Sequence, residues 1–386
     1  MSGADERVFT SDFLFATGAN LFVSLGQQMI SATLPVYVIA LGGSNADAGL
    51  VTGAAAITAL LVRPVAGYLS DAWRRRPVVL IGCCGYVLAS VVYLVGGSVA
   101  MLGLGRVVHG FGLSNYSTAA NTYVADIAPP RRRAEAIGFF AATQDIGIIT
   151  GPAIGFFIVG LLGFPKLFIF SATLAACALL SSAFARERRR PHGASRPPWS
   201  LRTGLIATDA LPSTWIGFCL GLGIGPLNTF LPIYASARGM QNPGLFFTVQ
   251  ALALLLTRTF AGRLADRRGR ALVIVPGMVA AATGIALLPL ASSLATFFVS
   301  AALWGAGFGC AQPASMALLV DQVRGERRGL GLSTYFMGFD VGIGSGAIAL
   351  GYLSQSVGWE VMWPASAACV LLGVLGLLGA RRSRSG

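Results

Sequence analysis

Long apolar stretches, separated by short polar segments, run through the whole chain. Each is close to the roughly 20 residues that an α-helix needs to cross a bilayer. The pattern therefore predicts an all-α integral membrane protein. Twelve transmembrane spans are predicted, at residues 12–41, 47–70, 77–97, 99–124, 134–162, 165–185, 211–237, 243–265, 271–291, 294–319, 329–355 and 359–380.

One connection between the predicted spans is much longer than the others. It begins near Arg186 and contains the sequence Arg-Arg-Arg-Pro-His-Gly-Ala-Ser-Arg-Pro-Pro. Segments rich in Pro, Gly, Ser and Arg do not pack into a core, so we interpret this one as a solvated loop. We expect an N-terminal six-helix bundle at residues 1–185, a cytoplasmic linker at 186–208 and a C-terminal six-helix bundle at 209–386.

The two halves repeat each other at one constant offset. The sequence Gly-Tyr-Leu-Ser-Asp that ends at Asp71 returns as Gly-Arg-Leu-Ala-Asp, which ends at Asp266. Charged residues inside hydrocarbon are expensive. Their duplication at matched depth indicates two pseudo-symmetric bundles around a central pathway, as in many transporters. The same offset relates Arg63 to Arg258, Gly110 to Gly305, Asp126 to Asp321, Asp145 to Asp340, Gly147 to Gly342 and Gly151 to Gly346.

Composition and charge agree with a membrane location. Hydrophobic residues make up 55% of the 386 and charged residues 11%, whereas a soluble domain carries about 25% charged residues. The net charge of +13 is concentrated in loops and helix ends on one side of the predicted topology, and Lys166 and Arg238 fall on the other. By the positive-inside rule, both termini are expected in the cytoplasm. We expect a multi-pass protein of the inner or plasma membrane, whose partner is the lipid bilayer and not nucleic acid.

Residue types that bind metals or catalyse reactions are scarce and scattered. The six cysteines lack Cys-x-x-Cys spacing, and the two histidines, His109 and His192, are far apart in sequence. We therefore predict no metal site and no cofactor. A polytopic membrane enzyme is only a remote alternative, because no catalytic cluster is recognisable. The chain also lacks a Walker motif, so ATP is not expected to be the direct energy source.

A motif at the end of the second span of each half resembles the signature of the major facilitator superfamily, G-x-L-a-D-r-x-G-r. The second copy matches it throughout, and the first keeps its Gly, Leu, Asp and final Arg. The resemblance implies the major-facilitator fold, with Arg75 paired to Asp126 and an equivalent set in the second half. It implies a cytoplasmic gate formed by Gly67, Asp71, Arg75, Asp126, Gly262, Asp266, Arg267, Arg270 and Asp321.

The fourth predicted span carries an arginine and a histidine in an otherwise apolar segment. That segment resembles the family's R-x-x-q-G-x-g motif, with His109 in place of Gln. Arg106 lies about 10 Å into its helix, where a charge needs a partner, and the second half has Ala301 there. Arg106 is expected either to act in proton coupling or substrate-anion contact, or to make a structural pair. His109 either titrates or packs as a neutral, hydrogen-bonded side chain.

The fifth predicted span contains a set of small residues around a proline: Gly147, Gly151, Pro152 and Gly155. It resembles the family's G-x-x-x-G-P-x-x-G-G motif, which is associated with members that export by antiport, although Phe156 replaces the last glycine. The proline is expected to kink the helix, while its small neighbours allow another helix to approach closely.

Two carboxylates are predicted to lie deep in the bilayer. Asp145 and Asp340 stand about 18 Å from the cytoplasmic face, near the midplane of a hydrocarbon layer about 30 Å thick. An intramembrane acid is a functional candidate by default, so we interpret each as a proton carrier or a contact to a cationic substrate. The alternative is that both are structural polar groups. Of the two, Asp145 is favoured as the proton carrier and Asp340 as the substrate contact.

Other polar and aromatic side chains within the spans are candidates for lining a cavity. Each alone is more often a packing group than a ligand contact, but as a set they indicate a mixed polar and aromatic cavity. They are Gln27, Gln28, Tyr37, Asn228 and Tyr234.

Together these features predict a monomeric secondary active transporter that moves small organic molecules by alternating access. Proton-coupled efflux is the favoured function, with protons exchanged against the substrate. A proton symporter for sugar or organic-acid uptake is the alternative, because titrating acids fit both directions.

Overall fold

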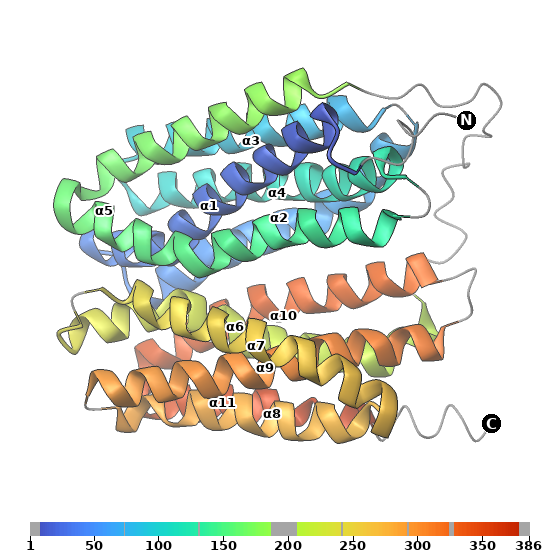
Figure 1. Cartoon of the computed structure of the whole chain (residues 1–386). Coiled ribbons are helices and arrows are strands. Elements are labelled where there is room, and N and C mark those ends of the chain that lie inside the picture. Colours follow the sequence, from blue (N-terminus) through green and yellow to red (C-terminus); the bar gives the residue numbers. More distant parts are fainter. Residues whose placement is uncertain are drawn as a thin grey trace. The chain divides into compact units, whose positions relative to one another are not determined.

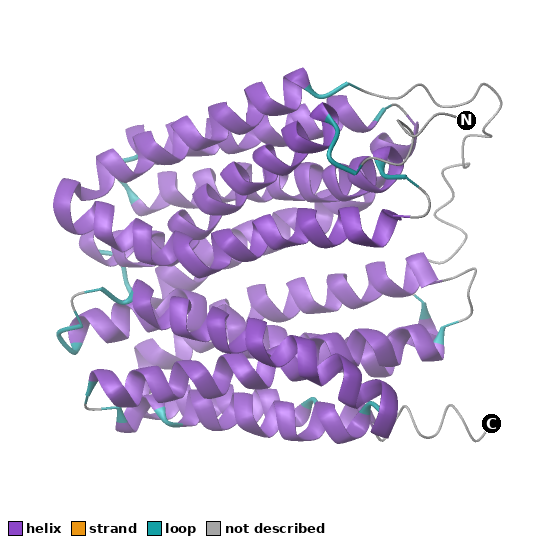
Figure 2. Ribbon diagram, viewed as in Figure 1, coloured by secondary structure: helices purple, strands orange, loops and turns teal. Residues whose placement is uncertain are grey.

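The structure is a computed structural model built from helices (Figure 1 and Figure 2). It describes residues 8–72, 74–129, 132–186, 207–240, 242–291, 293–323 and 328–377, and no strand occurs within these ranges. For a few of these residues it describes the backbone but not the side chain, namely Asp71, Ala72, Ala134, Thr259, Asp266, Arg328 and Gly329.

Eleven α-helices follow one another along the described chain, with short 3-10 turns at Thr208–Ala210 and Leu288–Leu290. The helices are α1 (Ser11–Ala40), α2 (Asn45–Ala72), α3 (Arg75–Val95), α4 (Val99–Ile127), α5 (Arg133–Phe184), α6 (Leu211–Ala237), α7 (Gly244–Arg268), α8 (Ala271–Ala286), α9 (Leu294–Gln322), α10 (Arg328–Val357) and α11 (Trp359–Leu372).

Every predicted span corresponds to one of these helices or to one arm of a helix. The spans predicted at 134–162 and 165–185 are the two arms of α5, which meet at Gly163 (Figure 1). Gly163 has φ 79° and ψ 172°, a conformation that glycine adopts without the steric cost of a Cβ. By length and composition, 10 helices of the described residues can cross a membrane. The all-α membrane architecture predicted from sequence is thus confirmed.

Local hydrogen bonds fix where several helices begin. Ser98 precedes α4, and its hydroxyl accepts the N–H of Met101 at 3.3 Å. Ser293 and Thr296 form a reciprocal capping box at the start of α9. Such caps satisfy backbone N–H groups that have no partner inside the helix. These polar residues therefore fix the residues at which α4 and α9 begin.

The chain divides into two compact units. Unit 1 comprises residues 1–33 and 57–199, and unit 2 comprises residues 34–56 and 200–386. The predicted linker lies largely outside the described residues, and the contacts group residues 34–56 with the second half. The assignment of six helices to each bundle remains a prediction.

Unit 1 is held together by glycines that let helices approach closely. A Cβ added at Gly82 of α3 would lie 2.5 Å from the amide nitrogen of Tyr116 on α4, and one at Gly85 would lie 2.8 Å from the Cα of Gly112. Real Cβ contacts are not this short, so the close packing of α3 on α4 depends on these positions being glycine.

Glycines also allow the helices of unit 2 to approach closely. Glycines at 221 and 225 of α6 lie directly against the backbone of Phe339 and Ile343 on α10. The first turns of α2 belong to this unit, and Gly49 lies against the carbonyl of Ala347 on α10. Small residues are the usual interface of membrane helices, because van der Waals packing there replaces the hydrophobic effect.

Candidate functional site

A cluster of polar side chains lies inside unit 1, on α4 and the helices packed against it. Arg106 is 6% exposed and His109 is 4% exposed. The ring of Tyr86 on α3 meets the His109 ring edge-on, with centroids 4.9 Å apart and planes at 89°. The Tyr93 ring lies 6.4 Å from that of His109. We call Tyr86, Tyr93, Arg106 and His109 the Arg106 cluster.

Hydrogen bonds tie the Arg106 cluster to α1. The hydroxyl of Tyr86 donates to Oε1 of Gln27 at 3.2 Å. One turn away on α3, the hydroxyls of Ser90 and Ser171 lie 3.1 Å apart, which joins α3 to the second arm of α5. Gln27 was predicted to line a cavity, and the structure places its side chain in contact with this cluster.

No ion pair joins Arg106 to an acid whose side chain the structure describes. Within the same part of the structure, no hydrogen-bond partner is present for Nε and Nη1 of Arg106 or for Nε2 of His109. The guanidinium acts electrostatically on Tyr93 and His109. An unpaired buried charge costs several kcal/mol, by the order of magnitude found for buried ions in general. Arg106 therefore stands out as a buried cation without an acidic partner among the described side chains.

The glycine-proline segment of α5 packs against α1. A Cβ at Gly151 would lie 2.7 Å from Cβ of Gln28, and one at Gly155 would lie 3.1 Å from Cγ2 of Thr33. Gly147 lies directly against Ser24, whose hydroxyl donates to the carbonyl of Gln144 at 2.9 Å. The structure thus brings three of the predicted glycines to one seam, which we call the α1–α5 seam. Pro152 lies within α5 next to it.

The predicted intramembrane acids lie beside equivalent seams in the two units. Asp145 is half-buried on α5, two residues before Gly147, and Asp340 is half-buried on α10, two residues before Gly342. Gly342 packs on α6 against Phe218, as Gly147 packs on α1. The internal duplication therefore appears in the packing as well as in the sequence. Among the described side chains, Arg106 forms no ion pair with Asp145, so direct pairing is not how the two residues are related.

Two ion pairs occupy equivalent places in the predicted gate. Nε of Arg75 lies 3.2 Å from Oδ2 of Asp126, and Nε of Arg270 lies 3.1 Å from Oδ2 of Asp321. Arg75 also donates to the hydroxyl of Ser70 at 3.1 Å. In each half, the arginine therefore pairs with the acid at the end of the fourth helix. This pairing is the one that the resemblance to the family motif implies.

Other gate residues are placed less fully. The side chains of Asp71 and Asp266 lie outside the described part of the structure. No atom lies within 4 Å of a Cβ added at Gly67 or Gly262, so neither glycine is required by contacts with described neighbours. Arg267 is exposed at the end of α7.

Three other cavity candidates, Tyr37, Asn228 and Tyr234, belong to unit 2. Tyr234 is 2% exposed in unit 2, where its hydroxyl donates to the carbonyl of Leu288 at 3.1 Å. Its ring packs on Trp363 at 5.7 Å and carries the Arg238 guanidinium 4.5 Å from its centroid. These contacts favour a packing role for Tyr234. Tyr37 and Asn228 are half-buried.

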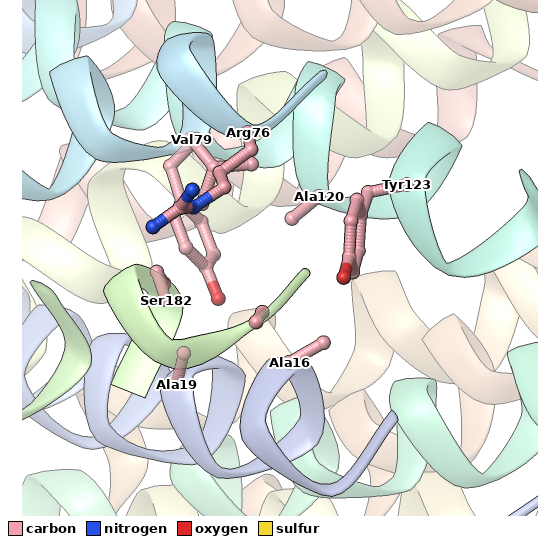
Figure 3. Close-up of a pocket in the computed structure, with 9 residues that line it drawn as sticks. Ala16, Ala19, Arg76, Val79, Ala120, Tyr123 and Ser182 are labelled. Atoms are coloured by element: carbon pink, nitrogen blue, oxygen red, sulfur yellow. The ribbon is translucent and has the colours of Figure 1, made fainter. Parts of the chain in front are cut away.

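A small cavity of about 20 Å³ lies elsewhere in unit 1 (Figure 3). Arg76 and Tyr123 lie on opposite sides of it, and Ala16 and Ala19 of α1 complete its wall (Figure 3). This volume holds about one water molecule, so it is far too small for an organic substrate. Arg76 donates there to the carbonyl of Ala183.

Sequence reasoning missed the two tyrosines of the Arg106 cluster. Tyr86 and Tyr93 are seven positions apart on α3, a spacing that puts both on one helix face. That spacing was a usable signal, but only the packing of α3 against α4 shows which neighbour the face meets.

The apolar helices, the duplicated seams and the two equivalent ion pairs are features of a multi-pass membrane protein built from two related halves. The family model of the Major Facilitator Superfamily matches residues 16–246 and 214–386, and the chain belongs to that superfamily. It is accordingly a transporter and not an enzyme.

Individual relatives are distant. An uncharacterised MFS-type transporter of Methanocaldococcus jannaschii is 23% identical over 369 residues, covering 93% of this chain and 95% of that protein. The quinolone resistance protein NorA of Staphylococcus aureus is 25% identical over 242 residues, or 60% of each chain. Among solved structures, a D-xylose-proton symporter superposes with a TM-score of 0.76 at 18% identity, covering 97% of this chain and 96% of that one. At that identity, the last match shows the fold alone.

Proposed function

We propose that this transporter exports small organic molecules in exchange for protons. Two features support export. The glycine-proline segment of α5 resembles a motif associated with antiporters, and the chain resembles a protein whose name records quinolone resistance. Because that relative is matched over only 60% of its length, its substrate is a starting point for assays and not an assignment.

The observation that carries the proposal is the uncompensated charge of Arg106. A transporter that exchanges ions needs charged groups whose partners change during the cycle. A buried guanidinium that meets no described acid, beside a histidine whose Nε2 has no described partner, is such a group. In the proposal the Arg106 guanidinium stabilises a negative charge. That charge is either part of the substrate or on a group that has released its proton.

The intramembrane acids complete the proposed mechanism. We assign proton binding to Asp145 and substrate contact to Asp340. Alternation between the two membrane faces uses the gate residues, with Asp71 and Asp266 at the inner ends of α2 and α7. The proposal also keeps a monomer. It keeps cytoplasmic termini as well, which the basic residues of the predicted inner loops support.

Transport into proteoliposomes tests both the function and its direction, with a fluoroquinolone and a panel of other small organic molecules as probes. An antiporter accumulates substrate in vesicles whose lumen is acidic, because protons leave as substrate enters. A symporter accumulates it in vesicles whose lumen is alkaline. Accumulation only with an alkaline lumen would replace export by the uptake alternative. Uptake of the probe that is the same with and without a pH gradient would rule out proton coupling.

A further inference from the structure

Unit 2 contains a groove whose lining includes the predicted gate residue Arg267 but none of the residues to which proton or substrate binding is assigned. It has a volume of about 680 Å³ and lies along α7, α8 and α9. Its wall is almost entirely apolar, and several of the side chains are well exposed: Phe260 is 71% exposed and Leu272 is 51% exposed. Further lining residues are Thr257, Leu264, Pro276, Ala280, Ala306 and Cys310.

The groove is amphipathic along its length. Two arginines line one end, Arg263 and Arg267, four positions apart and so on one face of α7. From Thr257 to Arg267 the helix rises about 15 Å, which is half of a hydrocarbon layer about 30 Å thick. The groove therefore has the length of one leaflet, with positive charge where the headgroups of that leaflet lie.

These two arginines are not part of the ion pairs that the structure describes. The neighbouring Arg270 forms the ion pair with Asp321, whereas no ion pair joins Arg263 or Arg267 to any side chain that the structure describes. The internal duplication places Tyr68 and Ala72 at the equivalent positions of the first half. The shared framework of the two halves is therefore built without them.

We propose that this groove is a binding site for an anionic phospholipid. One acyl chain packs along Phe260, Leu272 and the rest of the apolar wall, and the phosphate accepts hydrogen bonds from Arg263 and Arg267. Guanidinium groups bind phosphate oxygens strongly and often through two hydrogen bonds. Basic pockets between membrane helices at the basic side of a protein are suited to such headgroups. A free anion would leave the apolar wall unused, and a zwitterionic lipid would leave the paired positive charge without its complement.

The binding experiment uses purified, delipidated full-length protein and two lipids with the same acyl chains, phosphatidylglycerol and phosphatidylcholine. Retention of each lipid is measured by native mass spectrometry over a concentration series. The protein should prefer phosphatidylglycerol. A basic residue near an anionic surface contributes about fivefold in affinity, so the double variant Arg263→Gln/Arg267→Gln should lose about thirtyfold for phosphatidylglycerol and change little for phosphatidylcholine.

The control removes one positive charge from the same helix end. Arg268 follows Arg267 directly but does not line the groove, so Arg268→Gln should change phosphatidylglycerol binding by less than about twofold, as screened surface charges do. A second variant, Ala280→Trp, places a large side chain in the groove and should reduce the retention of both lipids. Thermal unfolding without added lipid confirms that each variant is folded.

Equal retention of the two lipids by the unaltered protein would overturn the proposal. So would unchanged phosphatidylglycerol binding in the double variant, or an equal loss in Arg268→Gln. Competition by glycerol phosphate at the affinity of the whole lipid would show a free-anion site and reject the lipid. The measurement does not involve transport, so it stands or fails independently of the proposed export.

Discussion

Replacing Gly151 by alanine should weaken the α1–α5 seam. A Cβ at this position would lie 2.7 Å from the Cβ of Gln28 and 3.3 Å from both the carbonyl oxygen of Leu25 and the amide nitrogen of Met29. Carbon atoms in contact are normally about 3.5–4.0 Å apart. The Cβ of Gln28 is fixed to the backbone of α1 and cannot rotate away. The two helices must therefore separate by about 1 Å, at the cost of the contacts on either side.

The steric cost of a Cβ at Gly151 can be separated from the gain in helix propensity that any glycine-to-alanine change brings. Overpacking costs about 1–3 kcal/mol, while alanine regains up to about 1 kcal/mol of helix propensity over glycine. Gly138 supplies the control, because it lies on the same helix and a Cβ there meets nothing within 4 Å. The propensity gain is common to Gly151→Ala and Gly138→Ala. The difference in stability between the two variants is then the steric cost, about 1–3 kcal/mol.

Thermal unfolding in detergent measures that difference. A thiol-reactive dye reports the exposure of the buried cysteines Cys83 and Cys219, one in each unit. For domains of 150–250 residues, 1 kcal/mol corresponds to about 2–4 °C, so Gly151→Ala should unfold several degrees below Gly138→Ala. Gly151→Leu should in addition make reconstituted vesicles leak. If both alanine variants unfold at the same temperature, the glycine is not required for the close approach of α1 and α5.

The remaining predictions concern charge. Arg106→Gln should abolish transport while thermal stability stays the same or rises, because an unpaired buried charge is destabilising; a marked loss of stability would instead indicate structural pairing. Asp145→Asn should lose pH-driven transport but keep substrate exchange, whereas Asp340→Asn should weaken substrate binding, and full pH-driven transport by Asp145→Asn would reject its role. Asp126→Asn should cost about 1–3 kcal/mol, because Asp126 is half-exposed but the side chain of its partner Arg75 is only 10% exposed and loses a charged hydrogen-bond partner, and like Asp71→Asn it should alter cysteine labelling on the two faces. Unchanged labelling with full transport would remove either residue from the gate.

The sequence alone determined the features that depend on the composition of a single helix. Spans of about 20 apolar residues form helices in lipid because the backbone must satisfy its own hydrogen bonds there. The pairing of Arg75 with Asp126 was also accessible, through a motif that recurs in both halves. A duplicated charge at matched positions is informative without coordinates, since random placement of charges in hydrocarbon is too costly to persist.

Other features depended on which helices meet. The prediction that Gly147, Gly151 and Gly155 admit a neighbour could not name α1 as that neighbour, because small residues permit close approach by any helix. Tyr234 is a similar case: its type fitted a cavity wall, yet its hydroxyl is bonded to Leu288 and its ring is packed on tryptophan.

The environment of Arg106 was decided only by the tertiary structure. The sequence showed that the arginine is deep in an apolar helix and lacks a counterpart in the second half. It could not show that its neighbours are Tyr86, Tyr93 and His109, which come from two helices. Hydropathy records the cost of burying a charge, but only folding decides whether neighbouring groups compensate that cost.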